Sequence, residues 1–175
     1  SQLIIYSSKL RGDHHQVNTQ TVLFEEDSKR LSQACIKLQQ QAYARAVFLL
    51  DKDGQLLASE GETANIDTTS LASLTAGNIA ATGGLAKLLG EREFPVQVHE
   101  GERESIHISL VGERLILVIL FDERSSLGLI RLKLKHTYND ILEISRDIFN
   151  KSNGEVRSVF SEITDDDIDD FFSLD

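Results

Sequence analysis

The strongest constraint on the fold is one apolar run, RLILVILF, at residues 114–121. Gly112-Glu113 precedes it and the polar sequence DERSS follows it, so the run has the length of a strand and is too short to span a membrane. Both of its alternating sets of side chains are apolar, and a strand of this kind must be covered on both faces. The run therefore predicts a strand in the middle of a sheet that has packed layers on each side.

The rest of the chain supplies four more strands and three helices. Apolar residues recur at helical spacing in residues 25–43, 67–91 and 126 to about 150. Strands are predicted for AVFLL and QLLAS around a tight turn that ends in Gly54 at positive φ, and for VQVHE and SIHISLV before the apolar run. The order α-β-β-α-β-β-β-α predicts an α/β sandwich, in which a five-stranded, mainly antiparallel sheet carries helices on its faces.

A chain of 175 residues is long enough for one packed domain and a tail. We expect the domain at residues 21–150. Residues 1–20 are interpreted as a leader or a segment of non-native origin, with a strand at LIIY as the alternative. In residues 151–175, Ser152-Asn153-Gly154 predicts a linker, and the residues from Ile163 or Thr164 to Phe172 predict an acidic amphipathic helix.

The negative charge is concentrated in the tail. The formal net charge is -10, and residues 155–175 hold eight acidic residues and one arginine, a net of -7, which leaves -3 for the rest. This distribution offers no basic stripe for phosphates, so nucleic acid is excluded as a partner. A solvated tail is the alternative to a docking helix, but we favour docking because Ile168, Phe171 and Phe172 share one side of the predicted helix. Ile163, at the start of that helix, is counted with them as a partner-binding residue.

The helix predicted for DTTSLASLTAGNIAATGGLAKLLGE, residues 67–91, contains three glycines, each of which costs about 1 kcal/mol relative to alanine. At 100° per residue one stripe, which we expect to face the sheet, holds Leu71, Leu74, Leu85 and Leu89. The adjacent stripe, called here the small-residue lane, holds Ser73, Gly77, Ala80 and Gly84, with Ala81 between the two. The lane either packs inside the chain or admits the close approach of another molecule. We favour an intermolecular surface, because the leucines already provide a core face.

Catalytic and metal motifs are weak. Cys35 is the only cysteine and lies on the apolar side of a predicted helix, which favours a buried hydrophobe over a reactive thiol. His14 and His15 lie in the leader, while His99 and His107 fall in neighbouring strands and are expected to be half-exposed rather than metal ligands. No nucleophile elbow, HExxH sequence or phosphate-binding glycine loop is found.

One arginine lies where it could act on a partner's nucleotide. Asp122, Arg124 and Ser126 cluster in the turn after the apolar run, and an exposed arginine in a loop can stabilise a transferring phosphoryl group. A solvated turn charge is the commoner role of such a residue. We therefore assign no arginine finger and no catalytic residue.

Three segments resemble the MglB branch of the bacterial Roadblock/dynein light chain family. They are residues 48–91, residues 94–133 and the terminal sequence FSEITDDDIDDFF. Together the similarity extends over about residues 19–175, with NIDTTSLASLTAGN and the acidic end as its most specific parts. Residues 1–18 lie outside it.

The resemblance implies a homodimer, with the sheets joined edge to edge and the paired second helices forming a platform for one MglA-like, Ras-related small GTPase. Ala80 and Gly84 match family positions at that contact, and the lane with Leu88 is the implied partner-binding surface. The C-terminal helix is implied to be a second contact that affects nucleotide exchange. Stimulation of GTP hydrolysis is implied to need no donated arginine.

Further expectations follow from the same resemblance. The protein itself needs no cofactor or metal, because GTP and magnesium belong to the GTPase. A cytoplasmic location, concentrated at a cell pole, and a role in polarity and motility are implied, without membrane insertion. The alternatives are a scaffold that binds the GTPase without stimulating hydrolysis and, less favoured, a metal enzyme that uses His99 and His107.

Overall fold

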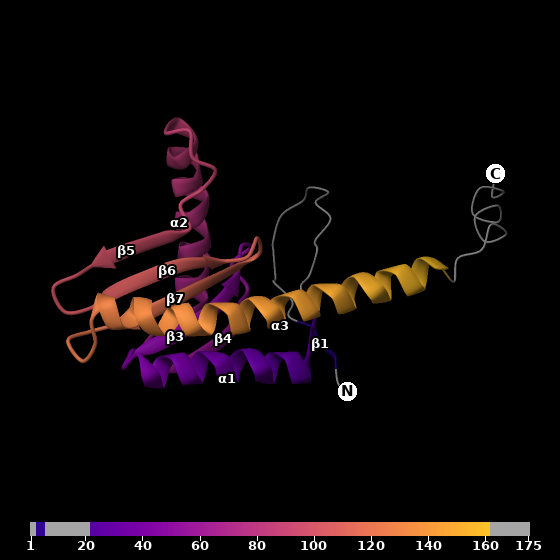
Figure 1. Ribbon diagram of the computed structural model, residues 1–175, viewed down its shortest axis with the longest axis horizontal. Coiled ribbons are helices and arrows are strands. Elements are labelled where there is room, and N and C mark those ends of the chain that lie inside the picture. The colour runs from indigo at the N-terminus through magenta and orange to yellow at the C-terminus, as the bar shows by residue number, and fades with distance from the viewer. Residues whose placement is uncertain (1–2, 6–21, 162–175) are drawn as a thin grey trace.

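The computed structural model describes residues 3–5 and 22–161 and is built around a five-stranded sheet (Figure 1). The strands follow the order β4-β3-β7-β6-β5, and each neighbouring pair is antiparallel. The predicted sheet is thereby confirmed, with the apolar run in its middle as β7. The strand bounds are β3 Ala46–Asp51, β4 Leu56–Gly61, β5 Val96–Glu100, β6 Ser105–Val111 and β7 Leu115–Phe121.

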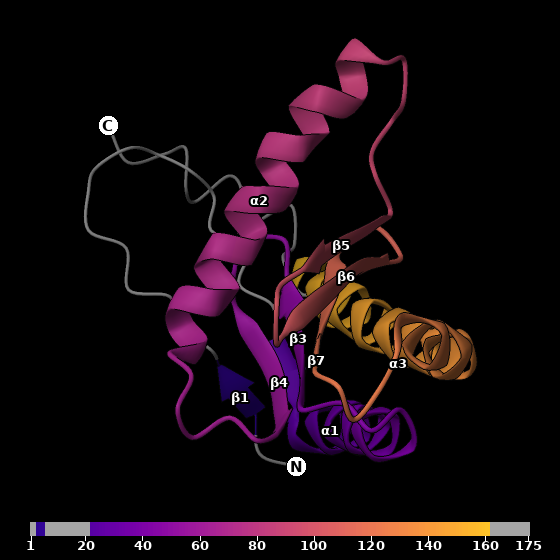
Figure 2. The same cartoon turned by 90° about the vertical axis from the view of Figure 1, so that its left-hand side faces the viewer.

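Helices cover both faces of this sheet. α1 (Glu25–Gln41) and α3 (Leu127–Ser161) lie against each other on one face, and α2 (Thr68–Leu88) crosses the other face (Figures 1 and 2). The order of helices and strands through the five-stranded sheet is the predicted one. The predicted α/β sandwich is therefore confirmed.

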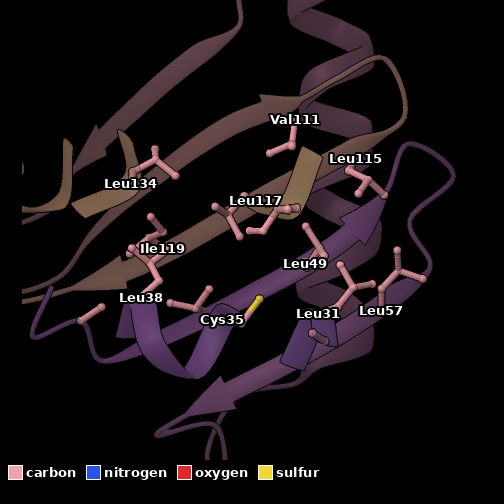
Figure 3. Close-up of a cluster of buried hydrophobic side chains, with 14 of the residues drawn as sticks. Leu31, Cys35, Leu38, Leu49, Leu57, Val111, Leu115, Leu117, Ile119 and Leu134 are labelled. Atoms are coloured by element: carbon pink, nitrogen blue, oxygen red, sulfur yellow. The ribbon is translucent and has the colours of Figure 1, made fainter. Parts of the chain in front are cut away.

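The alternation of side chains along β7 explains why its apolar run has no polar interruption. Leu117 and Ile119 point into the cluster beneath α1 and α3, together with Leu31 and Cys35 (Figure 3). Ile116, Val118 and Leu120 point into the cluster beneath α2. All seven residues of β7 are buried, as expected for a strand that is covered on both faces.

A second, smaller sheet is formed near the N-terminus. β1 (Leu3–Ile5) pairs antiparallel with β2 (Val22–Phe24), which leads directly into α1. A strand at LIIY was the alternative to a leader, and β1 lies there. The assignment of residues 1–20 as a leader stays a prediction, because most of this segment lies outside the described residues.

α3 is longer than predicted. It continues to Ser161, so the predicted end near Asn150 is wrong, and Ser152-Asn153-Gly154 lie within the helix instead of forming a linker. Gly154 costs this helix only about 1 kcal/mol relative to alanine. Lys151, which precedes Ser152, is fixed to α1 by an ion pair with Asp27, so the helix is held in place up to this point. The predicted acidic helix that ends at Phe172 lies outside the described residues.

The turn between β3 and β4 has the predicted geometry, with Gly54 at φ +86°. Asp51 fixes the turn, since its Oδ1 accepts hydrogen bonds from the backbone N–H groups of Asp53 and Gln55 at 3.0 and 2.9 Å. In the described part of the chain no helix has both the length and the apolar character that a bilayer crossing requires.

Candidate functional site

The candidate site is α2, the helix that carries the small-residue lane. Its first turn is capped by Asp67, whose Oδ1 accepts from the Ser70 N–H at 3.0 Å and whose Oδ2 accepts from the Ser70 hydroxyl at 2.7 Å. These hydrogen bonds to Ser70 lower the pKa of the Asp67 carboxyl below its ordinary value. Such a cap satisfies N–H groups that have no partner within the helix, and it fixes where α2 starts.

The sheet-facing side of α2 is built mainly from small side chains. Ala72, Thr75 and Ala86 are buried, and Ile79 is partly buried against the sheet. The helix backbone therefore comes close to its neighbours. A Cβ added to Gly54 would lie only 3.4 Å from the Cα of Ser73, so the turn between β3 and β4 packs against the backbone of α2.

The predicted leucine face is wrong for three of its four residues. Leu71 does pack against the sheet. Leu74, Leu85 and Leu89 are instead exposed, with 74%, 56% and 73% of their surface accessible. The physical reason is the narrow space under α2, which the alanines fill. The helical pattern was right, but the side of the helix that faces the sheet was misassigned.

Polar side chains hold the second half of α2 to β5. Asn78 donates from Nδ2 to Oε1 of Gln97 at 2.9 Å, and Gln97 donates from Nε2 to the hydroxyl of Thr82 at 2.7 Å. The Thr82 hydroxyl in turn donates to the carbonyl of Asn78 at 2.8 Å. This network fixes the rotation of α2 about its axis, and hence which residues face outward.

The lane lies on the outward side. All of the α2 residues that were predicted to bind a partner are exposed, and Leu88 is 81% accessible. A Cβ added to Gly77 or Gly84 would meet no other atom within 4 Å. No described part of the chain thus requires glycine at these positions. The exposed set comprises Ser73, Gly77, Ala80, Ala81, Gly84 and Leu88.

The C-terminal turns of α2 extend beyond the sheet, and the following segment returns from the tip of the helix to β5 (Figure 2). A cavity of about 390 Å³ lies between these turns and the returning segment, and Ala80 and Gly84 of the lane border it. Lys52, Lys87 and Arg92 also line this cavity, and Lys52 pairs with Glu93 at 3.4 Å. The lane is consequently flanked on one side by a cavity that holds three basic side chains and Glu93, and on the other side by exposed leucines.

Arg124 is held by carboxylates of its own chain. Its guanidinium donates to Glu62 at 2.7 and 3.1 Å and to Asp122 at 2.8 Å. The hydrogen bonds with Glu62, and next those with Asp122, raise the pKa of Arg124 above its ordinary value. An arginine finger must leave such partners to reach a phosphate, so the geometry gives Arg124 a structural role at the end of the sheet.

The two strand histidines do not form a metal site. His107 is opposite Val98 in the β5–β6 pairing and His99 is opposite Ile106, so the two imidazoles point to opposite faces of the sheet. His99 is exposed, but His107 is only 1% accessible, which corrects the expectation that both are half-exposed. Among the described residues no cluster of three metal-ligating side chains is found.

Cys35 is a core residue. Its side chain lies in the cluster beneath α1 (Figure 3), and burial raises the pKa of the thiol to about 12. A thiol of this kind is not ionised at neutral pH and has no nucleophilic role. Four of the residues predicted to bind a partner lie outside the described part of the chain, namely Ile163, Ile168, Phe171 and Phe172.

The sequence reasoning missed the exposed leucines as part of the candidate surface. Leu74, Leu85 and Leu89 join Leu88 on the outward side of α2. A signal for this arrangement was present in the opposite stripe, where Ala72 and Ala86 are small enough to lie against a sheet. Large exposed apolar residues that gather on one helix are typical of a protein interface.

Comparison with known proteins gives one family. Residues 32–121 match the model of the Roadblock/LC7 domain. A solved structure of Myxococcus xanthus MglB is 52% identical, with a TM-score of 0.69 over 72% of this chain and 95% of that chain. A gliding protein MglB from Thermus thermophilus is 34% identical, with a TM-score of 0.67 over 71% of this chain and 95% of that chain.

A third solved structure, described as MglB with a tetrameric arrangement, is 32% identical, with a TM-score of 0.69 over 72% of this chain and 95% of that chain. A search of curated protein sequences found no match. The family match covers more than half of the chain, and the three structural matches combine sequence identities of 32–52% with TM-scores of 0.67–0.69. The chain therefore belongs to the Roadblock/LC7 family, as an MglB-type member.

Proposed function

We propose that this protein is a homodimeric regulator of an MglA-type, Ras-like GTPase, and that it stimulates GTP hydrolysis by that partner. The observation that carries the proposal is the outward face of α2, where the glycines of the lane have open space around them. The similarity to MglB proteins supports the same partner class. The Roadblock/LC7 domain is a regulatory fold, and this supports a regulator over an enzyme with its own active site.

The energetics of α2 favour a contact surface. Gly77, Gly83 and Gly84 weaken the helix by about 1 kcal/mol each relative to alanine, and no side chain or backbone of the described chain fills the space that a Cβ would occupy. The lane exposes helix backbone beside large leucines. A partner that packs onto this surface gains close backbone approach and apolar burial together.

The proposed activation works by positioning. Arg124 is already engaged by Glu62 and Asp122, so the described residues of the turn after β7 offer no free arginine finger. The protein instead holds the GTPase in the arrangement in which the GTPase's own residues reach the nucleotide. Positioning alone can lower a barrier by several kcal/mol. GTP and magnesium belong to the partner, and this protein carries no cofactor.

The proposed dimer joins two copies edge to edge through β5, one of the two edge strands of the described sheet and the one that the Gln97 network links to α2. Joining β5 to its copy pairs the two α2 helices into one platform that accepts one GTPase. The C-terminal segment with Ile163, Ile168, Phe171 and Phe172 makes the second contact and affects nucleotide exchange. The complex acts in the cytoplasm at a cell pole, in the control of polarity and motility.

The test is multiple-turnover GTP hydrolysis by the cognate GTPase with the wild-type protein and with Gly84→Arg. Arginine at this exposed position blocks close approach while the fold is retained, so stimulation and complex formation are expected to fall at least tenfold. Gln40→Arg adds the same charge on the exposed side of α1 and serves as the matched control. Undiminished binding and hydrolysis with Gly84→Arg would exclude the lane as the contact.

A non-catalytic scaffold is the second candidate, because the described residues present no catalytic group to a docked GTPase. The same assay separates the two functions when the mass of the complex is measured in parallel. A two-to-one complex that hydrolyses GTP faster than the GTPase alone supports activation. A stable complex with an unchanged rate assigns the protein to the scaffold class.

A further inference from the structure

A second cavity lies on the sheet face opposite α2, between the strands β5 and β6 and the first half of α3. Its volume is about 560 Å³, which is in the range of pockets that hold small molecules. Because the lane is on the other face of the sheet, this cavity plays no part in the proposed GTPase contact. Val96, His107 and Ser109 line it from the strands, and Arg131 and Leu134 line it from α3.

Two buried polar atoms beside this cavity have no partner among the described residues. They are Nδ1 of His107 and Oγ of Ser109, on side chains that are 1% and 3% accessible. The two residues alternate along β6, so both side chains point to the α3 face of the sheet, and both line the cavity. Buried polar groups in native proteins are nearly always hydrogen-bonded, so these two indicate a missing partner.

The charged residues of the cavity are all positive. Arg131 and Lys135 lie one turn apart on the exposed side of α3, and neither forms an ion pair with any described residue. No aspartate or glutamate lines the cavity. Two neighbouring cations that have no counter-ion among residues 22–161, next to a partly apolar pocket, are suited to a carboxylate or sulfonate.

The remaining lining defines what the rest of a ligand must be. Pro95, Val96, Leu110 and Leu134 form apolar walls. Tyr138 accepts a hydrogen bond at its hydroxyl from the N–H of Gly112 at 3.3 Å, so its own proton is available for donation. Burial, and next the charge of Arg131, lower the pKa of His107, so at neutral pH its imidazole is uncharged.

We propose that this cavity binds a small amphipathic organic anion, whose acidic group pairs with Arg131 and Lys135 and whose apolar body lies against Val96 and Leu134. Nδ1 of His107 and Oγ of Ser109 have almost no accessible surface, so these side chains turn toward the cavity before a hydroxyl or carbonyl on that body supplies the hydrogen bonds they lack. The site lies on the sheet face opposite the lane, and Val96 in its wall belongs to β5, the edge through which the proposed dimer forms, so a ligand here acts beside the dimer edge and not on the lane.

The probe for the test is 8-anilinonaphthalene-1-sulfonate, an aromatic anion whose fluorescence rises in apolar surroundings, titrated into the full chain and displaced with decanoate. The double variant Arg131→Gln/Lys135→Gln changes two exposed side chains and is expected to raise the dissociation constant at least tenfold. Lys133→Gln/Arg146→Gln makes the same charge change elsewhere on α3, and it should stay within twofold of wild type.

A second readout locates the probe, because exposed leucines on α2 also attract such dyes. The imidazole resonances of His107, assigned with His107→Gln, are expected to shift when the probe is added, while those of exposed His99 stay unchanged. Equal affinity in the two double variants, or no shift at His107, would overturn the proposal. The proposal would also be overturned if a second copy of the chain fills the cavity. In that case wild type would bind no probe, and Arg131→Gln/Lys135→Gln would no longer form the dimer.

Discussion

The two faces of the sheet use leucine in opposite ways. On the face covered by α1 and α3, Leu31 and Leu38 are 0% accessible and pack into the sheet. On the face covered by α2, Leu74 and Leu88 are 74% and 81% accessible. α1, which carries Leu31 and Leu38, and α2, which carries Leu74 and Leu88, both have apolar residues at helical spacing. Helical spacing of apolar residues therefore shows that a helix has an apolar side, but not whether that side packs into the chain's own core or against a partner.

The largest expected effect is loss of a core leucine. Leu38→Ala removes a fully buried side chain and leaves a cavity, so the free energy of unfolding should fall by about 2–5 kcal/mol. Leu88→Ala changes the monomer by about 0.5 kcal/mol or less, since the side chain is already in water. Urea unfolding at several protein concentrations measures both.

Urea unfolding at several protein concentrations separates an effect inside one chain from an effect on the dimer. The effect of Leu38→Ala should be the same at every protein concentration, because the cavity lies inside one chain. Any larger effect of Leu88→Ala should appear only where the protein is dimeric. A cost for Leu88→Ala that matches that of Leu38→Ala in the monomer would show that the two faces do not differ.

The second prediction concerns the ion pair that joins α1 to α3. Asp27 is fully buried, and Lys151 donates to its two carboxylate oxygens at 3.2 and 3.1 Å. Lys151→Ala leaves the buried carboxylate with the Arg30 contact at 3.4 Å, so unfolding should become easier by about 1–3 kcal/mol. α2 has no comparable buried ion pair among the described residues.

The control for this prediction is Lys29→Ala. Lys29 pairs with Glu25 at 3.8 Å one turn away on α1, and its side chain is 71% accessible. An exposed pair of this kind contributes about 0.3–0.5 kcal/mol. Thermal unfolding of the two variants ranks them, and a cost of Lys151→Ala no larger than that of Lys29→Ala would mean that water replaces the lysine at Asp27.

The sequence was enough to predict the sheet but not the faces of α2. The run at Leu115–Phe121 is apolar on both sides, and only a central strand accommodates that pattern, so β7 and the element order were predictable. For α2 the leucine stripe and the stripe with Ala72 and Ala86 are both compatible with burial. The choice depends on how close the turn at Gly54 comes to the helix, and that distance is a property of the folded chain.

The end of α3 was not predictable for a related reason. Ser152-Asn153-Gly154 is a typical loop sequence, yet a helix that is anchored before it can continue through it at small cost. The anchor, the pair between Lys151 and Asp27, joins residues that are far apart in the sequence. The small-residue lane is exposed, but the reason for expecting it there, that the leucines fill the space against the sheet, is wrong for three of the four leucines, and its role as a contact stays a prediction.

The third prediction uses the glycines to separate stability from contact. Gly84→Ala adds a Cβ in open space on α2, so the helix should be more stable by about 0.5–1 kcal/mol. Gly61→Ala is the matched control near the α1 face. Its φ is +94° and a Cβ would lie 2.5 Å from the carbonyl oxygen of Arg45, so this change should destabilise the fold.

Measurement of GTPase stimulation completes this test. Gly84→Ala should unfold at a higher temperature than wild type and yet stimulate hydrolysis less, because even a methyl group reduces the closeness of approach. If Gly84→Ala improves stability and leaves stimulation unchanged, bare backbone at this position is not needed for the contact. The difference between the two faces would then have no shown consequence for GTPase stimulation.

The smallest expected effect is a pH dependence on the α1 and α3 face. In the folded chain, burial and the charge of Arg131 lower the pKa of His107, whereas the unfolded chain keeps a value of about 6.5. As the pH falls through that value, the unfolded chain binds a proton that the folded chain does not. The free energy of unfolding should therefore decrease toward lower pH and be fully retained above about pH 7.

His107→Gln should remove this slope, while His99→Gln should keep it, because His99 is exposed on the other side of the sheet. Urea unfolding between about pH 5 and 8 measures the difference between the two variants, and carboxylates common to both cancel in it. A slope that persists in His107→Gln would assign the pH dependence to other groups. His107 would then contribute no measurable part of the slope, because a variant that lacks its imidazole would show the same dependence.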